Sequence, residues 1–318
     1  MRSRIVVAVV VGVLLFVGAF AMRGLLVAHP GTFGTNVTSA ALPRNILLLG
    51  IDTRVKGGSK NTDVMIVAHL DPKQGRLYLM SVPRDTRVTI PAHGSQKINS
   101  AYAFGGPALA EQVVGQLLGT HIDYYAITNF DGFAQIIDTL GGVTVDVPQR
   151  MVYSASDVQI NLQPGVQHLN GTQALELVRF RHFALGDIGR IQDQQLVLKA
   201  AFKQAFQFGT LLKLPVLLPQ IQSAVHSNVP MPDVVAVGRA LASHDQSRLV
   251  SATAPGAYLN LPGISYWLVL PQDARNAWQA LLAGHPVSYW DTKAASAATA
   301  MGGQASVPTA SAPTTAHG

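Results

Sequence analysis

The stretch Asn45-Ile46-Leu47-Leu48-Leu49-Gly50-Ile51-Asp52 decides the fold class of this chain. It is a short apolar run that ends at a carboxylate, which is typical of a strand buried on both faces of a sheet. Two more apolar runs, at residues 64–70 and 77–82, predict further strands. The second and third strands are separated by a segment with the composition of a turn, Asp71-Pro72-Lys73-Gln74-Gly75.

A geometric consequence follows if these three strands form an antiparallel meander. The first strand ends at Asp52, the second begins at Asp63 on the same edge, and the third returns to that edge at Arg84 and Asp85. The meander therefore predicts that four charged residues, distant in sequence, gather at one edge of one sheet.

Beyond these strands, helical and strand signals alternate. Asn170 is a plausible N-cap for one helix, and Gly141-Gly142 is a stop signal for another. The three tryptophans, Trp267, Trp278 and Trp290, are expected in the core rather than on a sugar-binding platform. Helices are predicted over residues 107–118, 131–140, 169–178, 187–206, 232–242 and 271–282, and a further strand over 143–147. This mixture indicates an α/β protein with a central sheet covered by helices.

Composition narrows the class of partner. Of the 318 residues, 48% are hydrophobic and 13% are charged, which excludes a disordered chain, and the absence of cysteine excludes disulfides and thiolate metal sites. The formal net charge of +6 favours an anionic partner without choosing among nucleic acid, phospholipid, phosphate esters and acidic polymers.

The first residues predict an export signal. Arg2 and Arg4 precede an apolar run over residues 5–22, close to the ~20 residues that span a bilayer. We expect a cytoplasmic segment at 1–4, a transmembrane signal-anchor at 5–22, a linker at 23–43, an extracellular domain at 44–293 and a disordered tail at 294–318. Cleavage after Ala19-Phe20-Ala21 is the main alternative, and a buried core helix is the other. An exported domain meets little nucleic acid, so that partner is disfavoured.

Two clusters carry candidate chemistry. In the first, Asp52 and Asp63 suit a hard divalent cation, while Arg54 and Arg84 present planar forks that match phosphate oxygens. The alternative is structural: Asp52 caps a turn and Arg84 pairs with Asp85.

The second cluster contains Arg179 and Arg181, followed on a predicted helix face by Asp187, Arg190 and Gln194. Three arginines and an amide near a helix start indicate a pyrophosphate clamp, although a solvated, salt-bridged helix face is the alternative. Among familiar motifs, the phosphate-binding loop, the dinucleotide fingerprint, the HExxH zinc site and the GxSxG elbow are absent.

Taken in order, several motifs resemble the LytR-CpsA-Psr family of cell-wall glycopolymer ligases. The resemblance covers roughly residues 44–206, and one departure is Asp193, where the family often has arginine before the paired glutamines. Asp193 is expected to add negative charge beside the clamp, without harm if it faces solvent. The motifs are Asn45-Ile46-Leu47-Leu48-Leu49-Gly50-Ile51-Asp52, Asn61-Thr62-Asp63-Val64-Met65, Ser81-Val82-Pro83-Arg84-Asp85-Thr86, Lys97-Ile98-Asn99-Ser100-Ala101-Tyr102, Gly141-Gly142-Val143-Thr144-Val145-Asp146-Val147-Pro148, Leu169-Asn170-Gly171-Thr172-Gln173-Ala174-Leu175, Arg179-Phe180-Arg181, Asp187-Ile188-Gly189-Arg190 and Gln194-Gln195.

The resemblance implies an α-β-α sandwich around a mixed sheet, with an apolar pocket for a polyprenyl lipid. It implies transfer of a teichoic-acid- or capsule-like glycan from a polyprenyl-pyrophosphate carrier to peptidoglycan, through a phosphodiester. It ties Asp52 and Asp63 to Mg²⁺, with Mn²⁺ as the alternative. Catalytic roles are expected for Arg84, Asp85 and Arg181, and pyrophosphate binding for Arg54, Arg84, Arg179, Arg181, Arg190, Gln194 and Asp187. The rival hypotheses are a hydrolase acting on the same donor and a non-catalytic, membrane-anchored binder of wall polymer or lipid carrier.

Overall fold

The structure is a computed structural model of the 318-residue chain. It describes residues 44–51, 61–71, 76–155, 158–180, 186–205, 223–230 and 249–303. The predicted membrane segment at 5–22, the linker at 23–43 and the predicted helix at 232–242 lie outside the described residues. Within the described part, no helix combines the length and apolarity needed to cross a membrane.

A six-stranded mixed sheet forms the centre of the molecule, with strand order β11-β6-β1-β2-β3-β12. The three strands that come first along the chain form the predicted antiparallel meander: β1 (Arg44–Ile51), β2 (Thr62–Asp71) and β3 (Arg76–Ser81). β6 (Tyr124–Thr128) runs parallel to β1, and β12 (Leu249–Thr253) runs parallel to β3. The edge strand β11 (Val225–Ser227) pairs antiparallel with β6.

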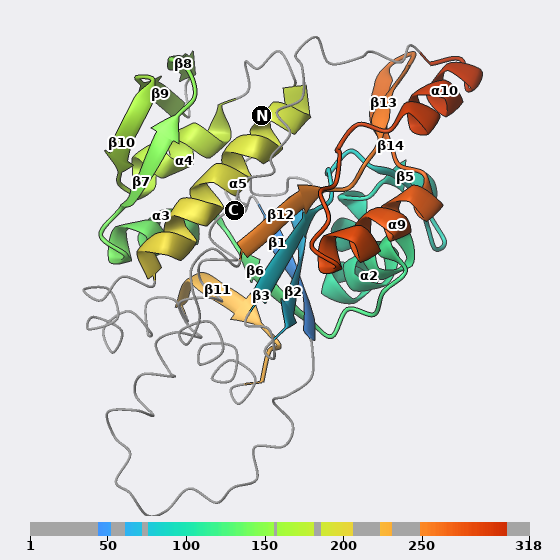
Figure 1. Ribbon diagram of the computed structural model, residues 1–318, viewed down its shortest axis with the longest axis horizontal. Helices are drawn as coiled ribbons and strands as arrows, with labels where there is room; N and C mark the ends of the chain where they lie inside the picture. Colours follow the sequence, from blue (N-terminus) through green and yellow to red (C-terminus); the bar gives the residue numbers. More distant parts are fainter. Residues whose placement is uncertain are drawn as a thin grey trace, which may run out of the picture.

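Helices cover both faces of this sheet, so the predicted three-layer arrangement is confirmed (Figure 1). On one side lie α3 (Phe130–Thr139), α4 (Gly171–Arg179) and α5 (Gly186–Ala205), and on the other lie α2 (Ser100–Leu118) and α9 (Pro271–Leu282). Strand β1 serves both layers, because Ile46 and Leu48 pack in the core toward α3–α5, whereas Leu47 and Leu49 pack in the core toward α2 and α9. Burial on both faces explains why this strand is continuously apolar.

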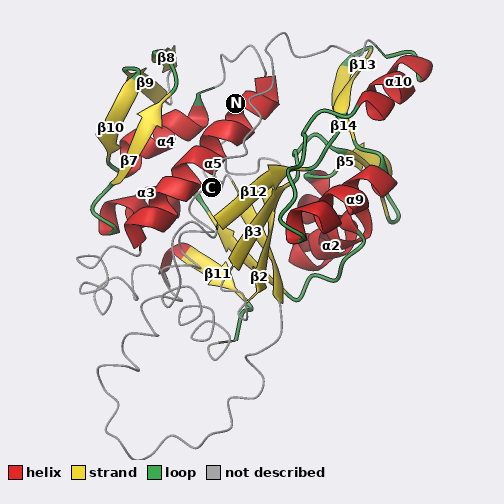
Figure 2. Ribbon diagram, viewed as in Figure 1, coloured by secondary structure: helices red, strands yellow, loops and turns green. Residues whose placement is uncertain are grey.

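Small two-stranded sheets extend the outer ends of the molecule (Figure 2). β7 (Val143–Val147) pairs with β10 (Gly165–Leu169), and β8 (Met151–Ala155) pairs with β9 (Val158–Leu162), both beside α4. On the opposite side, β4 (Arg87–Ile90) pairs with β5 (Gly94–Lys97), and β13 (Ala257–Leu261) pairs with β14 (Ile264–Leu268).

Most predicted boundaries agree with the structure to within one or two residues. Asn170 caps α4 through a complete capping box, as the sequence predicts. The helix predicted over 107–118 forms the second segment of α2 (Ser100–Leu118), which a kink at Gly105 and Gly106 divides in two. Gly106 has φ 65°, a conformation that glycine adopts without strain, and Pro107 then starts the second segment of the helix.

The tail requires a correction. In place of the disorder expected from residue 294, the structure has a helix, α10 (Thr292–Ala300), capped by Asp291. Small residues on one face, Ala294 and Ala298, are fully buried, and Ala298 packs with Leu259 and Leu268. An alanine-rich segment therefore completes a small core here, because alanine combines high helix propensity with close packing. Trp267 and Trp278 are buried at 2% and 1% exposure, which confirms their predicted place in the core.

The start of α4 predicts a sharp stability effect. A Cβ atom on Gly171 would overlap the backbone carbonyl of Ala134 in α3, and backbone cannot move aside as a flexible side chain can. We expect Gly171→Ala to lower the free energy of unfolding by about 3 kcal/mol, as overpacking does. Thr172→Ala, at the exposed next position, should change it by less than about 0.5 kcal/mol. Urea unfolding of both variants tests this, and equal stabilities would contradict the close approach of α3 and α4.

Candidate phosphate-binding site at one edge of the sheet

The topology assembles one edge of the sheet from distant parts of the chain. β1, β3, β6 and β12 all end there, and β2 begins there, as the pairing directions require. The arrowhead of β12 points toward the part of the molecule that carries β5, β13 and β14 (Figure 1). In α/β proteins, ligands bind at the carboxyl ends of the strands, so this edge is the natural place for a site.

A nearly buried ion pair lies at this edge. Arg84 Nη1 donates to Asp63 Oδ1 at 2.8 Å, and the two side chains are only 15% and 5% exposed. The meander thus brings together Asp63 and Arg84 as the sequence predicts. A guanidinium paired with one carboxylate oxygen still has other N–H donors, which suits it to phosphate oxygens.

Asp85 links Arg84 to a lysine that sequence reasoning left without a role. Lys97 Nζ lies 2.8 Å from Asp85 Oδ1, and Arg84 Nε lies 3.7 Å from Asp85 Oδ2. Lys97 is the first residue of the motif Lys97-Ile98-Asn99-Ser100-Ala101-Tyr102. Its place in that motif is the one sequence signal that could have marked it as a site residue. Because Asp85 contacts two cations, its first role in this geometry is to orient Arg84 and Lys97. The structural alternative, pairing of Arg84 with Asp85, is therefore present together with the closer pair to Asp63.

Backbone hydrogen bonds hold this segment in place. Thr86 Oγ1 donates to the Pro83 carbonyl at 2.6 Å, which closes a tight turn around Arg84 and Asp85. The Asn99 N–H donates to the Arg84 carbonyl at 3.2 Å, and the Trp267 N–H donates to the Asp85 carbonyl at 2.9 Å. Residues 84 and 85 are thus anchored from two sides by segments far along the chain, which favours a fixed orientation of their side chains.

Two residues of the second predicted cluster reach the same end of the sheet. Arg179, the last residue of α4, is 9% exposed, and its guanidinium carbon lies 5.9 Å from the centre of the Phe130 ring, just beyond β6. Gln194 in α5 is 4% exposed, and its buried Nε2 has no hydrogen-bond partner within the described residues. A buried amide donor without a partner costs free energy unless a ligand or water satisfies it, so Gln194 remains a strong candidate for substrate binding.

The neighbouring Gln195 has a different role. Its Nε2 donates to Ser81 Oγ and to the Ala252 carbonyl, each at 3.1 Å, and its Oε1 accepts from Ser251 Oγ at 3.2 Å. These bonds tie α5 to the ends of β3 and β12. Of the paired glutamines, Gln195 therefore fixes the helix to the sheet, while Gln194 keeps an unused donor.

Asp193 corrects an expectation. It does not face solvent, because the residue is only 4% exposed. Its Oδ2 atom has no hydrogen-bond partner within the described part. Burial raises the pKa of this carboxyl from 3.8 to about 8. The carboxyl is therefore mainly protonated at neutral pH, and the full negative charge expected beside the clamp is absent.

Several predicted residues lie outside the described residues, namely Asp52, Arg54 and Arg181. Asp187 and Arg190 belong to α5, but their side chains also lie outside the described part. The structure thus brings together Asp63, Arg84 and Asp85 and leaves the remaining predicted contacts untested.

The metal prediction stays a prediction. Asp63 supplies a hard oxygen donor of the kind that Mg²⁺ prefers, and Oδ1 is engaged by Arg84. Among the described side chains, no three histidine, aspartate or glutamate residues gather closely enough to hold a metal ion. The chemistry of the carboxylate fits Mg²⁺, and Asp52, its predicted partner as a ligand, lies outside the described residues.

The fold and this edge define an α/β protein with an arginine–carboxylate cluster suited to a phosphate-bearing ligand. The chain belongs to the LytR_cpsA_psr family, whose model matches residues 29–283.

Comparison with known proteins agrees with this assignment. The chain is 35% identical over 213 residues to the regulatory protein MsrR of Staphylococcus aureus (strain COL). The matched region covers 66% of this chain and 64% of MsrR, so this chain spans slightly less than two thirds of that relative. It is 32% identical over 253 residues to the polyisoprenyl-teichoic acid–peptidoglycan teichoic acid transferase TagU of Halalkalibacterium halodurans, covering 78% of this chain and 80% of TagU. The crystal structure of B. subtilis TagV superposes with a TM-score of 0.68 at 28% identity, covering 76% of this chain and 97% of TagV.

Proposed function

We propose that this chain transfers a phosphate-linked glycan from a polyprenyl-pyrophosphate carrier to peptidoglycan. The observation that carries the proposal is the nearly buried Asp63–Arg84 pair, joined through Asp85 to Lys97, at the carboxyl edge of the sheet. The similarity to TagU, a relative named as a teichoic acid–peptidoglycan transferase, supports the same reaction class.

In the proposed reaction, a hydroxyl oxygen of a peptidoglycan sugar attacks the phosphorus that bears the glycan. A new P–O bond forms, the bond from that phosphorus to the lipid-phosphate oxygen breaks, and polyprenyl monophosphate leaves. The hydroxyl proton passes to a carboxylate, with Asp85 as the proposed acceptor, or to water. Phosphoryl transfer of this kind depends mainly on positioning and charge stabilisation, which arginines and fixed dipoles supply.

Each proposed residue has a place in this scheme. Arg84, Arg179 and Gln194 would donate to pyrophosphate oxygens, together with Arg54, Arg181 and Arg190, and Asp187 would line the pyrophosphate-binding site. Asp52 and Asp63 would hold Mg²⁺, or Mn²⁺, which when bound neutralises phosphate charge. We also propose that an apolar pocket holds the prenyl chain and that residues 5–22 anchor the domain to the outer face of the cell membrane.

Turnover by the full chain in detergent tests the proposal. The donor is a synthetic polyprenyl-pyrophosphate glycan, the acceptor is a peptidoglycan oligomer, and mass spectrometry follows the products with Mg²⁺ and after chelation. We expect glycan joined to the oligomer through phosphate, and loss of that product with EDTA and its return with Mg²⁺. Free phosphoglycan in the presence of acceptor would indicate a hydrolase instead. A donor that binds and stays intact would indicate a binding protein.

A further inference from the structure

Beside the proposed site, the β4–β5 hairpin places two cations directly opposite each other. Arg87 and Lys97 are paired positions in this antiparallel ladder, so their side chains project from the same face. Like charges in such a pair repel and destabilise a hairpin. Their presence requires a group that offsets the repulsion.

Tyr266 in β14 is the group that both cations contact. The guanidinium carbon of Arg87 lies 5.8 Å from the centre of its ring, and Lys97 Nζ lies 5.9 Å from it. Lys97 is shared with Asp85, whereas Arg87 makes no ion pair with a carboxylate within the described residues, and its Nη1 contacts Met301 Sδ at 3.9 Å. Arg87 and Tyr266 are partly exposed. The result is a cationic aromatic surface whose arginine is available to an anion.

This surface is joined to the proposed site by backbone. Trp267, the residue after Tyr266, donates its N–H to the Asp85 carbonyl at 2.9 Å, and Thr86 forms a β-bridge with Trp267. Main-chain contacts therefore hold the backbone next to Tyr266 at a fixed place relative to Asp85. A ligand seated on the ring would lie beside Asp85, where the attacking hydroxyl must be held.

We propose that Arg87, Lys97 and Tyr266 form the acceptor-binding surface, which takes an acidic glycan: a sugar packs against the exposed part of the Tyr266 side chain, and a carboxylate of an attached peptide stem pairs with Arg87. The proposal rests on the proposed function, since it names the residues that recognise its acceptor. Aromatic faces bind the C–H faces of sugars, and arginine binds carboxylates through two parallel hydrogen bonds. A peptidoglycan strand presents both groups, because its amino sugars carry peptide stems with free carboxylates.

Steady-state kinetics of the full chain separate this role from a general loss of activity. Tyr266→Ala and Arg87→Gln should each raise the KM for the peptidoglycan oligomer about fivefold to tenfold, the size expected for one stacking or cation–π contact. The KM for the lipid donor should stay unchanged. An unchanged acceptor KM, or an equal rise in both KM values, would overturn the proposal.

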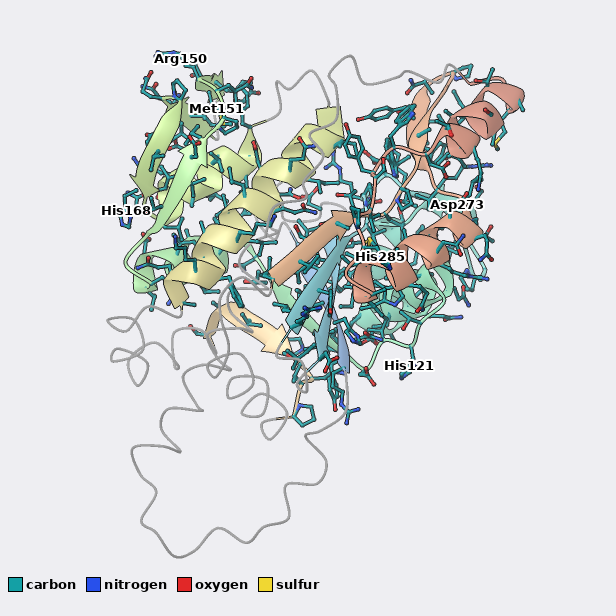
Figure 3. All side chains as sticks on the ribbon, viewed as in Figure 1. His121, Arg150, Met151, His168, Asp273 and His285 are labelled. Atoms are coloured by element: carbon teal, nitrogen blue, oxygen red, sulfur yellow. The ribbon has the colours of Figure 1, made fainter. Side chains whose placement is uncertain are left out.

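A matched pair of control substitutions is available on the far side of the molecule. Arg150→Gln and Tyr153→Ala alter an exposed arginine and an exposed tyrosine at the β8–β9 hairpin, where Figure 3 shows Arg150 far from β5 and β14. Neither control should change the KM for either substrate. An acceptor effect as large in the controls would show that the surface beside Asp85 has no special role.

Direct binding keeps this test independent of the transfer reaction. Fluorescence anisotropy with a labelled oligomer should show about fivefold to tenfold weaker binding to both variants, even if wild-type protein proves to catalyse no transfer. Amidation of the stem carboxylates should weaken binding to wild type but not to Arg87→Gln; equal binding of amidated and free oligomers by wild type would refute the carboxylate contact. If the variants instead lose binding to anionic phospholipid vesicles and keep oligomer binding, the surface contacts the membrane and the proposal fails.

Discussion

Replacing Arg84 with glutamine should lower kcat/KM for the lipid donor about a thousandfold, which corresponds to about 4 kcal/mol of transition-state stabilisation. The guanidinium is held at the sheet edge by Asp63 at 2.8 Å and by the neighbouring Asp85 at 3.7 Å. Its remaining N–H donors need no rearrangement to meet the charge that develops on phosphate oxygens. Arg84→Lys keeps the charge but loses the planar fork, so its rate should fall between those of wild type and the glutamine variant.

The same substitution also affects stability, and the two effects have to be separated. Arg84 neutralises the nearly buried carboxylate of Asp63, so its removal should lower the free energy of unfolding by about 2 kcal/mol. Urea unfolding measures this loss, and the assay should run at a temperature where the variant is fully folded. Arg150→Gln, at an exposed arginine on the other side of the molecule, should leave both the rate and the stability unchanged.

A double variant tests whether Arg84 acts only on Asp63. Asp63→Asn with Arg84→Gln removes the buried charge together with its partner, so part of the lost stability should return. If Arg84 binds phosphate, the rate of the double variant should stay at or below that of Arg84→Gln. Recovery of turnover in the double variant would remove Arg84 from the proposed phosphate clamp and leave it a structural role.

Part of this site follows from the sequence because it depends on a local rule. Three apolar runs of strand length joined in a meander bring Asp63 next to Arg84, and no long-range contact enters that inference. The N-cap of α4 and the end of α3 also follow from short-range signals, since the hydrogen bonds involved span three or four residues. What each of these residues does chemically remains a prediction.

Other parts depend on contacts that no local pattern encodes. β12 joins β3 from far along the chain, and Gln195 touches both strands only after that pairing exists. The segment 87–97 lacks clear apolar alternation, so the β4–β5 hairpin and the Lys97–Asp85 contact were not predicted. The run Gln192-Asp193-Gln194-Gln195 has the polarity of a solvated helix face. This polar run is largely buried because it lies between two apolar parts of α5. Ile188 and Ile191 pack in the core beside α2 and α9, and Leu198 and Phe202 pack in the core beside α3 and α4.

Asp193 predicts an unusual dependence of stability on pH. Burial raises the pKa of its carboxyl from 3.8 to about 8, so the folded chain retains a proton that the unfolded chain loses over this range. Because the folded state binds more protons, stability falls as pH rises, from about pH 4 to about pH 8. The contribution of this carboxyl should be close to 1.4 kcal/mol per pH unit within the window, which gives a cost of about 4 kcal/mol at pH 7 as an upper estimate.

Asp193→Asn removes this titration while keeping the shape of the side chain. We expect the free energy of unfolding of the asparagine variant to exceed that of wild type by a few kcal/mol at pH 8, and the difference to shrink steadily toward pH 5. Urea unfolding of both proteins at several pH values measures the difference directly. Asp146→Asn, at an exposed position of β7, is the matched control and should change the free energy of unfolding by less than about 0.5 kcal/mol.

The outcome also bears on the charge of the proposed clamp. A pH-dependent difference would mean that Asp193 is neutral at working pH and adds no negative charge to the Asp63 and Asp85 carboxylates that contact Arg84 and Lys97. A constant difference would mean that the folded and unfolded states hold the Asp193 proton equally, so that the carboxylate is ionised inside the protein. In that case a cation from outside the described residues has to compensate it, and substitution of Asp193 should strengthen donor binding by freeing that cation for pyrophosphate.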